Sequence, residues 1–113
     1  MITNKHVTDF LHALDQELFF EAHEVLEEAW YPKRFENCNE VKLLKGFINA
    51  AVSFELIKRG RSTQSKTPWK TYLKYRQFLF KTNTTTLNNY YSIFLKIELI
   101  QKKLLLKHSK LQS

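Results

Sequence analysis

Glycine and proline are scarce in this sequence, with two of each among 113 residues. Two-residue hairpin turns need glycine or asparagine at positive φ, so the shortage argues against a fold of many short strands. The single cysteine, Cys38, cannot close an internal disulfide, and no Cys-x-x-Cys pair or Cys/His cluster suggests structural zinc. These absences favour a helical protein in a reducing compartment, and we expect a cytoplasmic location.

Long hydrophobic runs are missing as well. The least polar segment, residues 46–57, contains Asn49, Ser53 and Glu55 and is shorter than the roughly 20 residues that span a bilayer. Residues 1–16 have no apolar stretch followed by a small-residue cleavage site, so no secretory signal is predicted. We therefore expect no membrane partner.

The composition suits one compact folded unit. Hydrophobic residues make up 43% of the chain and aromatic residues 14%, which is too rich for a disordered protein, and 113 residues are enough for one core. No internal repeat or linker suggests a boundary. We expect a single helical domain over residues 1–113.

The net charge of +7 is divided unevenly along the chain. Residues 1–55 carry 5 basic and 10 acidic side chains, whereas residues 56–113 carry 13 and 1. In one interpretation, the acidic half packs beside the basic half and stabilises it at long range. Alternatively, the division marks an acidic site and a separate basic binding surface.

The spacing of apolar residues predicts five helices, over about residues 8–14, 17–31, 40–59, 68–81 and 87–107. Side chains suited to cap the first, third and fourth helices stand near their starts: Thr8 or Asp9, Asn37 or Asn39, and Thr67. Pro32 should end the second helix, and Pro68 suits the first turn of the fourth after a polar loop over residues 61–67.

The predicted third helix is apolar over most of its circumference, with a narrow polar strip of Lys42, Lys45, Asn49 and Ser53. This pattern places it at the centre of the molecule, so the expected fold is an all-α bundle of about five helices around it. Gly46 removes side-chain bulk and would let a neighbouring helix approach closely. Gly60 is suited to end the helix in the left-handed conformation.

Residues 19–30, FFEAHEVLEEAW, mix five ionisable side chains with seven apolar ones. An advance of 100° per residue separates an apolar arc from an acidic stripe of Glu17, Glu21, Glu24 and Glu28. His23 and Glu27 fall at the border beside Trp30. Their spacing of four residues puts the imidazole and the carboxylate within reach of a hydrogen bond.

Three interpretations of this cluster stay open. The favoured one is a structural polar network in which the border pair hydrogen-bonds across to the third or first helix and the acidic stripe lies in solvent, because polar groups at a core edge commonly satisfy one another. In the second, His23 and Glu27, joined by Glu24 and Glu55, bind a divalent metal. The third is a small-ligand site with acid–base chemistry. Enzymatic activity is left undecided, and the favoured interpretation requires no cofactor.

Glu55 falls among apolar neighbours on the predicted third helix, where a lone carboxylate is costly to bury. We therefore expect it to form a buried or half-buried ion pair. The candidate partners are His23, Lys58, Arg59 and Arg76.

The segment F-E-A-H-E-V-L-E-E-x-W, which spans Glu21 to Trp30 with the preceding Phe, resembles the signature of domain-of-unknown-function family 309, a group of small bacterial and archaeal helical proteins. LLKGFINAAVSFELIKRG is similar to that family's second motif, with Gly46, Lys58 and Gly60 at matching positions. Together the resemblance covers about residues 8–60. It implies an all-helical bundle with the two motif helices packed together, and no established biochemical activity.

The sequence departs from the family pattern at two places. Family members usually have an Asn-x-Gly-like turn before the first motif, where this chain has LDQE at residues 14–17. The amide position of the second motif, commonly Gln, is Asn49 here. An amide contact carried over from the family would therefore come from a shorter side chain.

The predicted fourth helix separates apolar from basic residues. Lys70, Lys74 and Lys81 form a basic surface that suits nucleic-acid phosphates. The aromatic rings, Phe80 among them, fall on the side expected to face the core, where they cannot stack on bases. A solvated basic face is therefore favoured over nucleic-acid binding. A homodimer through the remaining apolar surface of the fifth helix is a further hypothesis.

Overall fold

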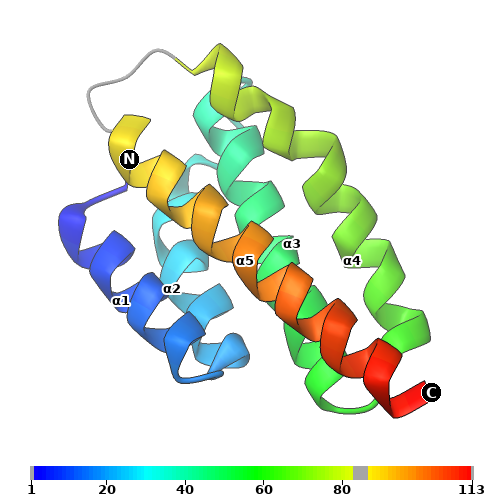
Figure 1. Ribbon diagram of the computed structural model, residues 1–113. Coiled ribbons are helices and arrows are strands. Elements are labelled where there is room, and N and C mark those ends of the chain that lie inside the picture. Colours follow the sequence, from blue (N-terminus) through cyan, green and yellow to red (C-terminus); the bar gives the residue numbers. More distant parts are fainter. Residues whose placement is uncertain (1, 83–86, 113) are drawn as a thin grey trace.

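A computed structural model describes residues 2–82 and 87–112, with side chains up to residue 107, and shows an all-α bundle (Figure 1). Its elements are α1 Asn4–Asp15, α2 Phe19–Trp30, η1 Tyr31–Lys33, α3 Asn39–Lys58, α4 Ser62–Tyr75, η2 Arg76–Lys81 and α5 Leu87–Gln112, where η marks a short 3-10 turn. The described residues contain no strand. The predicted fold class is confirmed, with α5 extending beyond residue 107.

α3 is the centre of the bundle because apolar residues cover most of its surface. It packs against α2, α4, η2 and α5, and Figure 1 shows α5 crossing in front of it. The residues buried along it are Val41, Leu43, Leu44, Gly46, Phe47, Ile48, Ala50, Ala51, Ser53 and Phe54. The prediction of a central apolar third helix is therefore confirmed.

Gly46 lies where α4 approaches α3. A Cβ atom on residue 46 would stand 3.0 Å from the Cβ of Tyr75, which is closer than two such atoms normally come. The missing side chain lets the α4 backbone come near, and Tyr72 of α4 is fully buried beside Phe47 of α3, with 6.4 Å between ring centroids. The expected close approach at Gly46 is confirmed.

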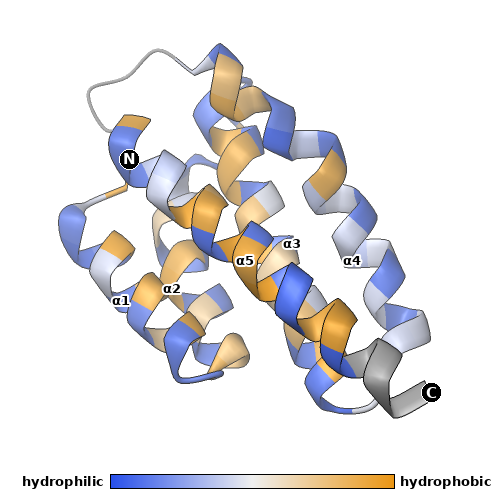
Figure 2. Ribbon diagram, viewed as in Figure 1, coloured by the Kyte–Doolittle hydropathy of each residue, from blue (hydrophilic) through white to orange (hydrophobic). Residues whose placement is uncertain are grey.

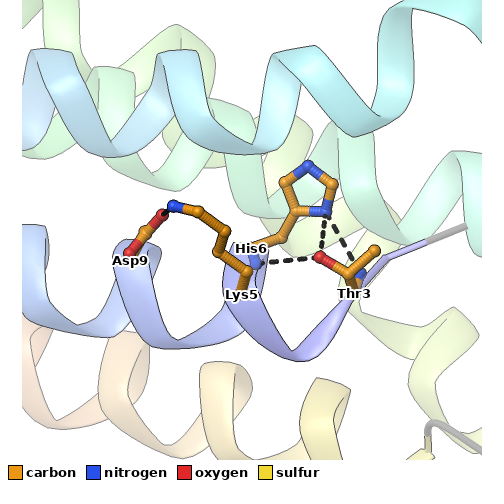
Figure 3. Close-up of polar contacts among 4 residues, drawn as sticks. All are labelled: Thr3, Lys5, His6 and Asp9. Atoms are coloured by element: carbon orange, nitrogen blue, oxygen red, sulfur yellow. Dashed lines mark hydrogen bonds and ion pairs between the residues drawn. The ribbon is translucent and has the colours of Figure 1, made fainter.

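α1 begins earlier than predicted because Thr3, rather than Thr8 or Asp9, caps it. The Thr3 hydroxyl accepts the N–H of His6 at 3.1 Å, and Nδ1 of His6 accepts the N–H of Thr3 at 3.1 Å (Figure 3). Lys5 and Asp9 form an ion pair of 2.7 Å along the same helix. A histidine takes the place that glutamate or glutamine usually fills in this reciprocal cap, which is why the sequence pattern misses it.

The predicted caps and loop before α3 and α4 are wrong. Cys38 stands at the N-cap of α3 without a side-chain hydrogen bond, and the Asn39 amide instead donates to the carbonyl of Lys81 at 2.9 Å. α4 begins at Ser62, so residues 61–67 are mostly helical and Thr67 is not a cap. The Ser53 hydroxyl of α3 donates to the carbonyl of Ser65 at 2.9 Å, a tertiary contact to the first turn of α4 that spacing does not reveal.

The two proline predictions have different outcomes. α2 ends at Trp30, so Pro32 follows the end of the second helix as predicted, and it lies in the 3-10 turn η1. Pro68 lies in the interior of α4, not in its first turn. Its missing N–H leaves the carbonyl of Gln64 without the usual helical donor, and Gln64 is exposed, so solvent can reach that carbonyl.

The chain tightens into a 3-10 turn after Tyr75, which changes the faces predicted for residues 76–81. Tyr72 and Leu79 are buried as expected, but the Phe80 side chain is 71% exposed. A continuous α-helix would turn Phe80 towards the core, whereas three residues per turn direct it outwards. The prediction that every ring of this segment faces the core is therefore wrong.

α5 carries an exposed apolar stripe of Tyr91, Leu95, Leu99 and Leu106. Figure 2 shows hydrophobic and hydrophilic turns interspersed along this helix. A homodimer through this surface stays a prediction. None of the helices in the described part of the chain combines the length and apolar content that a bilayer crossing requires.

Candidate functional site

α2 presents its side chains as helical spacing predicts. The buried residues Phe19, Ala22, Leu26 and Ala29 form one side, and the helix packs against α1 and α3. The acidic stripe is exposed on the other side at Glu21, Glu24 and Glu28, whereas Glu17, predicted to begin it, is exposed in the turn before α2. The expectation of a solvated acidic stripe is confirmed, and the polar groups that adjoin the core are those at the border.

His23 and Glu27 form a pair at this border. Nε2 of His23 lies 3.1 Å from a carboxylate oxygen of Glu27, and the imidazole is 18% exposed. Nδ1 lies 2.6 Å from the carbonyl oxygen of Phe20. Both contacts of His23 stay within α2, so the expected hydrogen bond from this pair across to the first or third helix is not formed in the described residues.

A metal ion finds little to bind in this arrangement. Of the carboxylates proposed to join His23 and Glu27, Glu24 is exposed on the acidic stripe and Glu55 is paired with Arg59. Within residues 2–82 and 87–112, no three His, Cys, Asp or Glu side chains are grouped to hold an ion.

Glu55 forms an ion pair with Arg59 on its own helix, α3. Nε of Arg59 lies 2.9 Å from the Glu55 carboxylate, whose side chain is half-buried. The expected ion pair is confirmed, with one of the four candidate partners. Arg76 instead pairs with Glu98 of α5 at 2.5 Å, because η2 directs it towards that helix.

A cavity of about 260 Å³ lies between the two motif helices. Its lining includes His23 from α2 and Glu55 and Arg59 from α3, with the apolar residues Phe19, Phe20, Val52 and Leu56. The structure thus brings His23 and Glu55 to one place although they are distant in sequence. Glu27 adjoins His23 but is not part of the lining.

Two other candidate residues lie away from this cavity. Asn49 donates to the carbonyl of Lys45 at 2.8 Å on its own helix. Nε1 of Trp30 is buried without a hydrogen-bond partner in the described residues. These two side chains therefore do not belong to a common site with His23.

The second-motif positions have structural tasks. Lys58 donates to the carbonyl of Glu17 at 2.8 Å, which ties the end of α3 to the turn between α1 and α2. Gly60 has φ 76 and ends α3 in the left-handed conformation, as predicted. Gly46 allows the close approach of α4 to α3, as described above. All three positions therefore maintain the packing of the bundle.

A second candidate site is a surface of lysines and rings that we call the basic aromatic face. It consists of Lys42 and Lys45 of α3, Lys74 and Tyr75 of α4, and Phe78 and Lys81 of η2. The ammonium groups of Lys42 and Lys81 lie 5.1 and 5.4 Å from the Phe78 ring centroid. The ammonium groups of Lys45 and Lys74 lie 5.7 and 5.2 Å from the Tyr75 ring centroid. The ring centroids of Tyr75 and Phe78 are 6.1 Å apart.

Sequence reasoning found only part of this face. Lys74 and Lys81 are among the predicted basic residues, whereas Lys70 makes no such ring contact in the described structure. Lys42 and Lys45 were visible only as a polar strip on the third helix. The spacing of residues on one helix does not show which other helix lies beside that strip.

Exposed rings adjoin the face at the turn after α2. The Phe35 side chain is 87% exposed, and the guanidinium of Arg34 lies 3.6 Å from the Tyr31 ring centroid and 4.4 Å from that of Phe35. A hollow of about 400 Å³ is lined by Lys33 and by Lys81, and also by the carboxylates Glu36 and Glu40. The turn and the basic aromatic face therefore border the same hollow.

Tyr72 of α4 is a buried titratable group close to these elements. Burial raises the pKa of Tyr72 above its ordinary value of 10.0, the negative charge of Glu98 raises it further, and Arg76 opposes these effects. The hydroxyl has no hydrogen-bond partner within the described residues. Tyr72 is therefore neutral at neutral pH and is part of the core.

The fold and these sites define a small all-α bundle whose two motif helices pack on each other next to a basic surface. The chain belongs to the family described as domain of unknown function (DUF309), whose profile matches residues 7–67. The resemblance of both motifs is thereby confirmed. No curated protein and no solved structure matches the chain.

Proposed function

We propose that this protein binds single-stranded nucleic acid through the basic aromatic face. The supporting observation is that four lysine ammonium groups from three elements converge on two neighbouring rings. In the part of the chain that the structure describes, none of the four is paired with a carboxylate. Such a cluster attracts phosphates, because binding releases the counterions condensed on the nucleic acid.

Exposed aromatic side chains supply the second requirement. Phe35 and Phe80 are mostly exposed. The Phe35 ring lies beside the guanidinium of Arg34, and the Phe80 ring lies 6.3 Å from that of Phe94 on α5. Stacking of an unpaired base on such a ring contributes about 1–3 kcal/mol per base. Bases in a duplex are not available for this contact, so single strands are the expected ligand.

The charge distribution also favours binding on one side. The acidic stripe of α2 repels phosphates, whereas the lysines of α3, α4 and η2 attract them. A strand is therefore expected to approach the basic aromatic face and to avoid the outer surface of α2.

Fluorescence anisotropy with a labelled oligothymidylate of about 20 nucleotides tests this proposal. Four phosphate contacts predict a slope of about −3 in a plot of the logarithm of the association constant against the logarithm of salt concentration. Lys42→Ala and Lys81→Ala should each reduce that slope by about 0.7. Phe35→Ala and Phe80→Ala should weaken binding at every salt concentration and leave the slope unchanged.

Lys103→Ala is the matched control, because it removes the same charge from an exposed position on α5. It should leave the affinity nearly unchanged. If Lys103→Ala weakens binding as much as Lys42→Ala, or if both phenylalanine variants bind like the parent, only unspecific charge attraction is present and the proposal is wrong.

For the cluster around His23 we infer a structural role. His23 bonds to Phe20 and Glu27 of α2, and Glu55 to Arg59 of α3, so each polar group is satisfied within its own helix. This arrangement pairs His23 and Glu55 while α2 and α3 bury their apolar sides, although Nε1 of Trp30 has no partner in the described residues. A cytoplasmic location and a single domain over residues 1–113 stay predictions, and both suit a nucleic-acid ligand.

A further inference from the structure

A cavity of about 450 Å³ lies between the C-terminal part of α3, the first turns of α4 and the second half of α5. Figure 1 shows the end of α5 beside the turn that joins α3 to α4. The cavity is at the opposite end of α4 from the basic aromatic face. Its apolar wall consists of Ile57, Trp69, Leu104 and Leu105.

The polar wall carries hydroxyl groups and one charge. Ser53, Ser62, Thr63 and Ser65 contribute the hydroxyls. The charge belongs to Lys66, and no carboxylate occurs among the described residues that line the cavity. The described part of the chain also provides no ion-pair partner for Lys66. A negatively charged group is therefore the complementary occupant near Lys66.

Gln101 has a side-chain oxygen that requires a hydrogen-bond donor from a molecule in the cavity. Its Oε1 atom is buried and has no hydrogen-bond partner in the described residues. The hydroxyls of Ser53 and Ser65, which line the same cavity, donate to the carbonyls of Ser65 and Ser62 at 2.9 and 2.6 Å. They have no second proton to offer Gln101. An N–H or O–H group in the cavity would satisfy the buried amide oxygen.

We propose that this cavity binds a small amphiphilic anion. Its carboxylate or sulfonate pairs with Lys66, its apolar or aromatic body packs on Trp69 and Leu104, and its N–H or O–H group donates to Gln101. The volume is within the range of small-molecule sites, which are mostly apolar with a few placed polar groups. This site is separate from the nucleic-acid surface, and neither proposal depends on the other.

The probe 8-anilinonaphthalene-1-sulfonate has all three features: a sulfonate, aromatic rings and an N–H group. The chain has two tryptophans, so Trp30→Phe leaves Trp69 as the single indole reporter. Titration of this variant should quench Trp69 fluorescence saturably with one equivalent of probe. Circular dichroism and a thermal melt establish that each variant is folded.

Matched variants on α4 locate the binding. Lys66→Gln should weaken it about tenfold through loss of a charge-assisted hydrogen bond, and Thr63→Phe should abolish it by filling the cavity. Lys70→Gln and Thr67→Phe alter exposed positions outside the lining and should bind like the parent. Probe binding without quenching of Trp69, parent-like binding by Thr63→Phe, or equal weakening by Lys66→Gln and Lys70→Gln would overturn the proposal.

Discussion

Glu17 ends α1 in the same kind of turn that Gly60 provides at the end of α3. In each turn, two backbone N–H groups donate hydrogen bonds to carbonyls of the last helical turn, at 2.8 to 3.1 Å. The two donors are this residue and the residue after it. The residue itself has positive φ, 58° for Glu17 and 76° for Gly60. Glycine adopts this conformation freely, whereas a side chain makes it unfavourable by roughly 1–2 kcal/mol.

Glu17→Gly should therefore raise the free energy of unfolding by about 1 kcal/mol. The turn is also where the sequence departs from the Asn-x-Gly-like pattern of its family. The hydrogen bond from Lys58 to residue 17 uses the backbone carbonyl and survives the change. Urea denaturation of the variant and the parent measures the difference.

Gly60→Ala is the converse control and should lower the free energy of unfolding by about 1 kcal/mol. A Cβ at this position meets no atom within 4 Å, so the loss would come from the backbone conformation alone. Gly60→Asn should be milder, because asparagine tolerates positive φ better. If Glu17→Gly is no more stable than the parent, the positive φ of Glu17 does not destabilise the turn after α1 and the prediction is wrong.

Gly46→Ala should lower the free energy of unfolding by about 1 kcal/mol. Alanine improves helix propensity by about 1 kcal/mol, but its Cβ would stand 3.0 Å from that of Tyr75, and overpacking costs about 1–3 kcal/mol. Thermal melts of the variant and the parent show whether the gain in helix propensity or the cost of overpacking is larger. A higher melting temperature for the variant would mean that α4 moves aside easily.

Tyr72→Phe should change how stability depends on pH. Burial raises the pKa of Tyr72 in the folded protein, so the unfolded chain ionises this residue first as the pH passes its ordinary value of 10.0. Tyr72 therefore contributes stability that is present below pH 10.0 and is lost as the pH rises above it. The phenylalanine variant should lose less stability on this alkaline side.

At neutral pH, Tyr72→Phe should change the free energy of unfolding by no more than about 1 kcal/mol, because the geometry of the described residues gives the buried hydroxyl no hydrogen-bond partner. Tyr91→Phe is the control, because it removes the same hydroxyl from an exposed position. Urea denaturation between neutral and alkaline pH gives both comparisons. Identical pH profiles for Tyr72→Phe and the parent would contradict the burial of a neutral hydroxyl.

The structural role of the His23–Glu27 pair predicts modest effects on stability and none on metal content. Glu27→Gln should reduce the free energy of unfolding by less than about 1 kcal/mol, since the pair lies within one helix and Glu27 is exposed to solvent on one side. His23→Ala should have a larger effect, because it also removes the bond to Phe20 and the ring contact at 4.9 Å.

Melting curves with and without added zinc distinguish this role from a metal site, and His12→Ala, at an exposed position on α1, is the control. Zinc should not raise the melting temperature of the parent. A zinc-dependent rise that disappears in His23→Ala, or stoichiometric metal in the purified protein by elemental analysis, would favour the metal interpretation.

Local patterns predicted most of the helices because burial and helical spacing act over a few residues. The arcs of α2, the pair at positions 23 and 27, the turn at Gly60 and the ion pair of Glu55 all depend on neighbours along one helix. The errors at the starts of α1 and α4 have another origin. A histidine completes the first cap, and a serine from α3 bonds to the first turn of α4.

The sequence by itself determined that this protein is all-α, that α3 is central and that its halves differ in charge, because composition and periodicity carry that information. Only the tertiary structure decided which surfaces meet. Lys42 and Lys45 join Lys74 and Lys81 because α4 and η2 pack along α3, and Phe80 faces outwards because the chain tightens after Tyr75. Such contacts depend on the packing of whole helices, which the spacing of residues within one helix does not contain.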